Sequence, residues 1–154
     1  MRFPSDRGGA PDPSRFRVQA PNSVARDILV VALDPQSAGL GPILAKSTWQ
    51  GALFVGFQDL PASAPGNWPD ALARRLPDLL IMVGTVGQTL AQAGAIGASC
   101  RKAGVKVSSI LLADAGISAK TLSEALLQLR PWSHTLAVLH EDSDLCDTLR
   151  ALGA

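Results

Sequence analysis

Two short loops carry the residue types that could bind an anion such as a phosphate group. The first, residues 34–41, contains a Gly-x-Gly pair, and the second, residues 84–89, contains two glycines and two threonines. Glycine lets the main chain approach a ligand, and main-chain N–H groups and hydroxyls hydrogen-bond to phosphate oxygens. The candidate ligand-binding residues in these loops are Gln36, Ser37, Gly39, Gly41, Gly84, Thr85, Gly87, Gln88 and Thr89.

Neither loop is a complete nucleotide-binding fingerprint. The first loop lacks the third glycine of a dinucleotide-binding loop and the lysine of a phosphate-binding P-loop. Both loops also fit ordinary strand-to-helix connections, in which glycine supplies backbone freedom and serine or threonine caps the helix. The sequence leaves both interpretations open. The cofactor is therefore unidentified, and a nucleotide is the candidate.

Other chemically active residue types do not form a recognisable site. Residues 140–144 group a histidine with acidic and hydroxyl side chains, but their spacing matches no zinc or EF-hand pattern, and helix capping explains them. No Gly-x-Ser-x-Gly nucleophile elbow accompanies the two histidines, His134 and His140. Cys100 and Cys146 lack metal-ligand spacing and are expected to be inert thiols. We therefore predict neither a metal site nor catalytic residues.

Five apolar runs alternate with helical patterns, and these elements must position the two loops. The expected strands cover residues 27–34, 51–57, 79–83, 105–113 and 134–140. The expected helices cover about 41–49, 69–75 and 88–102, then a segment ended by Pro131 and a closing helix capped by Asp142 or Ser143. Strands that are apolar on both faces and joined by helical crossovers predict a mainly parallel sheet between helix layers. The predicted fold is a three-layer, Rossmann-like α/β fold with a five-stranded sheet.

Two of the helices have distinctive local sequences. The helix over 88–102 is rich in alanine and glycine, and such small residues permit close approach of a sheet or a ligand. The helix before Pro131 can be capped by Ser118 or Thr121, and the residues from Thr121 to Glu124 fit a capping box.

Charge and composition divide the chain into two parts. Residues 1–26 carry five arginines and two aspartates, a net charge of +3, and we interpret them as a flexible Pro/Arg-rich tail that could touch an acidic partner. Residues 27–154 form the single α/β domain. The whole chain is nearly neutral, which gives no strong case for nucleic-acid binding. No apolar run is long enough to cross a bilayer or serve as a signal peptide, so we expect a cytoplasmic protein without membrane contact.

Residues from about 27 to 154 resemble, as an ordered set of segments, the nucleotide-binding half of the tubulin and bacterial cell-division FtsZ family. The similarity covers the loop 38–41, the strand 51–57, the segment from Asp78 through 84–89 to Gly104, the strand 105–112 and the segment 133–152. The family signature GGGTGTG is represented here only by residues 84–89, and the first loop has fewer glycines. The resemblance therefore implies a nucleotide-binding scaffold with an incomplete phosphate loop and without competent GTPase polymerisation.

These observations favour a non-catalytic, nucleotide-binding-like α/β module that acts as a subunit or as a regulatory or interaction protein. Its expected partners are a second copy of the chain or another protein. The alternative is a subunit of an enzyme that binds a dinucleotide or flavin at the carboxyl ends of the strands, with missing residues supplied by another chain. A third hypothesis is a pure interaction protein that uses its basic tail.

Overall fold

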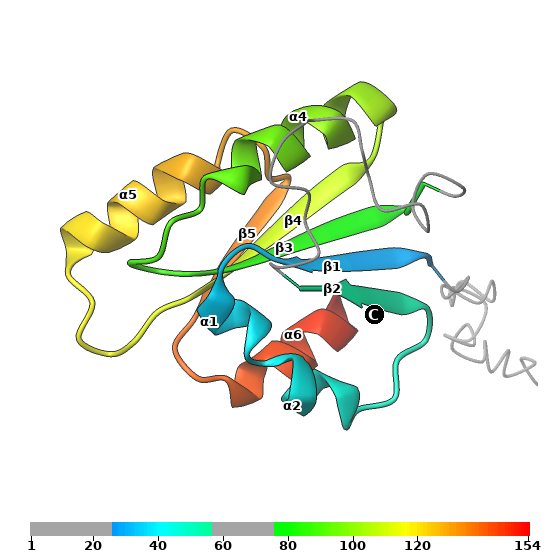
Figure 1. Cartoon of the computed structure of the whole chain (residues 1–154), viewed down its shortest axis with the longest axis horizontal. Coiled ribbons are helices and arrows are strands. Elements are labelled where there is room, and N and C mark those ends of the chain that lie inside the picture. The colour runs from blue at the N-terminus through cyan, green and yellow to red at the C-terminus, as the bar shows by residue number, and fades with distance from the viewer. Residues whose placement is uncertain (1–25, 57–75) are drawn as a thin grey trace, which may run out of the picture.

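Five strands form one parallel sheet in the computed structural model, which describes residues 26–56 and 76–154 (Figure 1). The strands are β1 (Ile28–Ala32), β2 (Ala52–Val55), β3 (Leu79–Thr85), β4 (Lys106–Leu112) and β5 (Thr135–Leu139). Their order across the sheet is β2-β1-β3-β4-β5, and every neighbouring pair is parallel. The predicted five-stranded parallel sheet is therefore confirmed.

The strand order places a reversal point between β1 and β3. From β1 the chain moves outward to β2 on one side, whereas β3, β4 and β5 follow one another on the other side. In doubly wound sheets of this order, ligands bind beyond the carboxyl ends of the strands at this reversal. The loops after β1 and β3 are the two that flank it.

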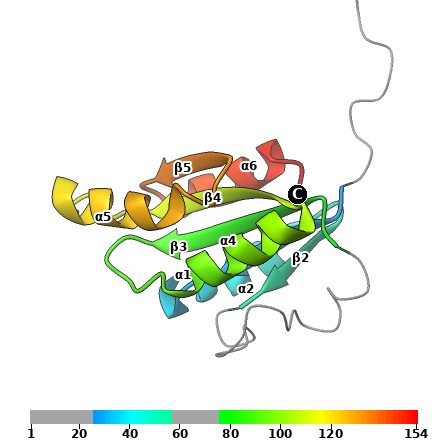
Figure 2. The ribbon, with the colours of Figure 1, turned by 90° about the horizontal axis from the view of Figure 1, so that it is seen from above.

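Helices cover both faces of the sheet and make the three layers of a Rossmann-like fold (Figures 1 and 2). They are α1 (Pro35–Ala38), α2 (Gly41–Ala45), α4 (Gln92–Ala103), α5 (Ala119–Leu129) and α6 (Ser143–Ala151). Helices α4 and α5 lie on one face, and α2 and α6 lie on the other. The predicted three-layer arrangement is confirmed.

The central strands β1, β3 and β4 are mostly apolar because each of them contributes side chains to two cores. Strand β4 also carries the polar residues Lys106, Ser108 and Ser109. Alternate residues such as Leu29 and Leu80 pack toward α4 and α5, whereas Ile28 and Ile81 pack toward α2 and α6. Side chains of successive strand residues point to opposite faces, so burial on both faces favours apolar residues at successive positions. All four of these side chains are at most 2% exposed.

Several boundaries differ from the sequence-based expectations. The first candidate loop, residues 34–41, contains the single-turn helix α1, because Asp34 caps it and Pro35 fits its first position. Helix α4 begins at Gln92 instead of about residue 88. The expected helix over 69–75, the strand end at Phe57 and the tail up to residue 25 lie outside the described residues.

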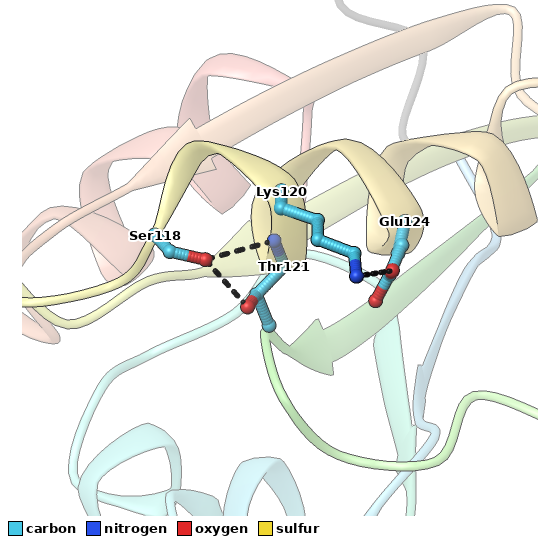
Figure 3. A network of polar contacts seen from close by, with 4 residues as sticks. All are labelled: Ser118, Lys120, Thr121 and Glu124. Carbon is cyan, nitrogen blue, oxygen red and sulfur yellow. Dashed lines mark hydrogen bonds and ion pairs between the residues drawn. The ribbon is translucent and has the colours of Figure 1, made fainter.

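Helix α5 begins one turn earlier than a capping box starting at Thr121 would place it (Figure 3). Ser118 is the cap: its Oγ accepts a hydrogen bond from the Thr121 main-chain N–H at 3.1 Å and lies 2.8 Å from Thr121 Oγ1. The prediction of Ser118 as a cap is thus confirmed, and the Thr121 capping box is wrong. Lys120 and Glu124 form an exposed pair at 4.0 Å, worth only a few tenths of a kcal/mol.

The small residues of α4 make room for an indole ring from the loop after α5. A Cβ atom built on Gly97 would lie 2.5 Å from both Cβ and Cγ of Trp132, whereas one on Gly94 would lie 3.9 Å from the ring. The Arg101 guanidinium lies 4.8 Å from the centroid of the same ring. The close approach that the small residues permit is therefore to Trp132.

This packing predicts opposite effects for the same substitution at two positions of α4. Gly97→Ala should lower the free energy of unfolding by about 1–3 kcal/mol, because the new methyl group overlaps Trp132. Gly94→Ala should be neutral or stabilising by up to about 1 kcal/mol, because alanine favours the helix and meets no clash. Urea unfolding of both variants measures the difference, and equal values would contradict the packing described.

Candidate functional site

The loop after β1 is organised around the carboxylate of Asp34. This side chain is 1% exposed, and its Oδ1 accepts a hydrogen bond of 2.9 Å from the Ser37 main-chain N–H. The Ser37 hydroxyl lies 3.0 Å from the main-chain oxygen of Asp34 and 3.1 Å from its Oδ2. Asp34 and Ser37 thus form the capping box of α1. Ser37, a predicted ligand residue, is buried in this network.

The same carboxylate joins the two predicted loops across the reversal point. Asp34 Oδ2 accepts a hydrogen bond of 2.8 Å from the Thr85 main-chain N–H at the end of β3. Two main-chain N–H groups from two loops therefore converge on one anion, which is the arrangement that binds phosphate in other proteins. Here the anion is the carboxylate of Asp34 itself. The N–H groups of Ser37 and Thr85 are consequently occupied, and a phosphate would have to displace a buried carboxylate.

Gln36 and Gln88 make a second contact between the loops. The Gln88 Nε2 group donates to Gln36 Oε1 at 3.3 Å, and both side chains are exposed. The structure therefore brings the loops after β1 and β3 to one edge, which we call the carboxyl edge because the carboxyl ends of the strands form it.

The glycines of the loops have conformational and packing roles. Gly84 leaves space for Leu90, since a Cβ atom there would lie 2.7 Å from Leu90 Cδ2. Gly87 has a φ of +90° in a turn closed by a 3.1 Å hydrogen bond from the Gln88 N–H to the Thr85 carbonyl. Gly39 ends α1, and Gly41 opens α2 in open space, where an added Cβ atom would meet nothing within 4 Å.

Thr89 does not cap the helix that follows it. It is exposed, and α4 begins three residues later with Ala91 at its cap position. Gly39, Gly41, Gly84, Gly87, Gln88 and Thr89 do not line the pocket at this edge. Only Gln36 and Thr85 among the predicted ligand residues do so.

The pocket has a volume of about 80 Å³ and lies where β3, β4 and β5 end. Its polar lining residues are Gln36, Thr85, Asp114, His140 and Asp142. Three of them, and the neighbouring Asp34, were not predicted as ligand residues. The signal that could have found them is positional, because each of these four residues follows the end of a strand by one to three positions in the sequence.

Thr85 Oγ1 is the least satisfied polar atom of the pocket. Thr85 is 4% exposed, and its hydroxyl has no hydrogen-bond partner. Within residues 26–56 and 76–154, only Gln92 Oε1 shares this condition. An unsatisfied buried hydroxyl costs about 1–3 kcal/mol. A ligand group that bonds to Thr85 Oγ1 would recover part of that free energy.

The other polar groups of the pocket are mainly hydrogen-bond acceptors. His140 Nδ1 lies 3.1 Å from the Ala113 carbonyl oxygen, so Nδ1 carries the proton and Nε2 of the neutral ring is an acceptor. Asp114 and Asp142 add two exposed carboxylates, and no lysine or arginine lines the pocket. The arrangement suits ligand groups that donate hydrogen bonds, such as hydroxyls and amines.

The cysteines do not contribute a nucleophile to this edge. Cys100 is fully buried in α4, and desolvation raises the pKa of its thiol to about 11, which keeps it protonated at neutral pH. Cys146 lies in α6, where its sulfur accepts a long contact of 3.9 Å from the Ser47 hydroxyl. Neither cysteine lines the pocket.

Searches of protein-family models, curated proteins and solved structures found no match to this chain. Within the described ranges, no three or more His, Cys, Asp or Glu side chains cluster closely enough to hold a metal ion. None of the helices in these ranges has both the length and the apolar character needed to cross a membrane.

The Asp34 network makes a prediction about stability. Asp34→Ala should lower the free energy of unfolding by about 2–4 kcal/mol, because the buried N–H groups of Ser37 and Thr85 lose their acceptor. Asp34→Asn should cost less, since the amide keeps one oxygen. The control is Asp114→Ala, an exposed position where we expect a change within about 0.5 kcal/mol. Denaturant unfolding that gave equal losses at Asp34 and Asp114 would contradict the network.

Proposed function

We propose that the chain is a non-catalytic α/β module that acts as a subunit or regulatory partner and binds a nucleoside-like ligand at its carboxyl edge. The observation that carries this proposal is the buried, unpartnered hydroxyl of Thr85, a residue that lines a pocket at the place where Rossmann-like folds bind ligands.

The chemistry of the edge favours the sugar of such a ligand over its phosphates. Asp114 and Asp142 can accept hydrogen bonds from ribose hydroxyls, which is how an acidic residue holds the ribose in dinucleotide-binding sites. The same carboxylates and Asp34 repel phosphate, and no cation of the pocket offsets them. The ligand is therefore recognised through its ribose hydroxyls. The glycine-containing loops do not bind its phosphates.

The size of the pocket supports a regulatory role. Sites that enclose a whole small molecule usually measure about 300–1,000 Å³, whereas this pocket of about 80 Å³ admits one small group of a ligand. Most of the ligand would stay in solvent, which favours weak and reversible binding. His140 is bonded through Nδ1 to a main-chain carbonyl and to no described hydroxyl or thiol, so the pocket offers no activated nucleophile.

The proposal predicts which ligands stabilise the protein. Adenosine or guanosine should raise the melting temperature at least as much as ATP or GTP does at equal concentration, since the triphosphate adds repulsion. A ligand present at 100 times its Kd stabilises by about 2.7 kcal/mol. Thr85→Val, which keeps the shape and removes the hydroxyl, should reduce this shift without destabilising the free protein. Thr89→Val, on the exposed part of the same loop, is the matched control.

Two results would overturn the proposal. The binding half fails if no nucleoside, nucleotide, NAD or FMN shifts the melting temperature. The assignment of the pocket fails if triphosphates stabilise far more than nucleosides and Thr85→Val responds to them like the unaltered protein.

A further inference from the structure

We propose that the opposite edge of the sheet carries a second ligand site, which binds small molecules bearing an oxyanion such as a phosphate monoester or a carboxylate. A cavity of about 380 Å³ lies between the end of α4, the start of β4 and the loop after α5. We call this side of the sheet the amino edge. The cavity is separate from the carboxyl edge and does not depend on the function proposed there.

The charged side chains of this cavity are all cationic. Arg101 and Lys106 line it together with the imidazole of His134, and none of its ten lining residues is an aspartate or glutamate. Opposite charges attract a ligand to such a recess, and the bond from a cationic donor to an oxyanion is stronger than one between neutral groups. The composition of the lining therefore selects for an anion.

Arg101 is held in place before any ligand arrives. Its guanidinium lies 4.8 Å from the centroid of the Trp132 ring and donates a hydrogen bond to the Pro131 carbonyl. A guanidinium has five N–H donors, so most of them stay available. Because contacts on two sides already restrict this side chain, binding an anion would cost little additional conformational entropy.

Lys106, the first residue of β4, and His134, which directly precedes β5, add two further donors. His134 Nδ1 accepts a hydrogen bond of 3.3 Å from the Val107 main-chain N–H, so the neutral ring carries its proton on Nε2 and can donate it. Lys106 is the first residue of β4 and is exposed, and its ammonium group forms no ion pair with a described residue. This cation is therefore free to meet a ligand.

The volume of this cavity indicates a ligand larger than an inorganic ion. About 380 Å³ lies within the range of small-molecule sites, and the apolar surfaces of Trp132 and Val105 share the lining with the cations. The ligand inferred is a small organic molecule whose oxyanion faces the cations and whose body lies against these apolar side chains.

The test is an NMR titration of the full chain that follows the indole N–H of Trp132. The probes are glucose 6-phosphate, glucuronate and glucose, which share a sugar ring and differ in the group at carbon six. Glucose 6-phosphate or glucuronate at about 10 mM should shift the indole signal, because a site with a Kd near 1 mM is mostly filled at that concentration. Glucose should not shift it, because it lacks the oxyanion. Which of the two anions binds more tightly distinguishes phosphate from carboxylate.

Lys106→Gln is the informative variant, because the ammonium group forms no ion pair with a described residue that the substitution would remove. It should weaken binding of the anionic probe by at least about tenfold, and added salt should weaken it further. Lys102→Gln, on an exposed position of α4 that does not line the cavity, is the matched control and should leave binding unchanged.

Three outcomes would overturn the inference. They are no shift with either anion, an equal shift with glucose, and equal binding by the Lys106→Gln variant and the unaltered protein. Thermal melting of each variant shows that any lost binding comes from the lost charge and not from unfolding.

Discussion

One buried carboxylate fixes the functional end of this molecule. Asp34 begins the loop after β1, caps α1 and accepts the N–H of Thr85 from β3, so it joins two segments that are 51 residues apart. A buried charge is tolerated only where hydrogen bonds replace its hydration. The folded positions of Ser37 and Thr85 follow from that requirement. The same requirement removes the main-chain donors that would otherwise attract a phosphate to this reversal point.

The pockets at the two ends of the sheet differ in charge because different residues follow and precede the strands. The carboxyl edge gathers Asp34, Asp114 and Asp142 after β1, β4 and β5, whereas the amino edge gathers Arg101, Lys106 and His134 around the start of β4 and β5. A parallel sheet places all strand starts on one side and all strand ends on the other. The pocket at the carboxyl edge is therefore lined by carboxylates, whereas the cavity at the amino edge is lined by cationic side chains.

The fold was predictable from sequence because its signals are local and repeated. Continuous apolar runs such as residues 27–34 require burial on both faces, and the structure has five strands where five runs stand. The candidate site was predictable only in its position. Gly84 and Gly87 suggested a phosphate loop, but their reasons are the Leu90 side chain and a turn with positive φ. Asp34 was missed because its partner Thr85 is distant in sequence, and the cavity beside Trp132 arises from packing between α4 and a loop after α5.

The central claim is that Asp34 occupies the anion position between the loops after β1 and β3. Amide hydrogen exchange at Thr85 measures this directly, because the Asp34 carboxylate accepts the N–H of that residue. We predict slow exchange at Thr85, at the same rate with and without phosphate in the buffer. Exchange at Thr85 as fast as at the exposed residue Gly87 in phosphate-free buffer, slowed when phosphate is added, would contradict the claim.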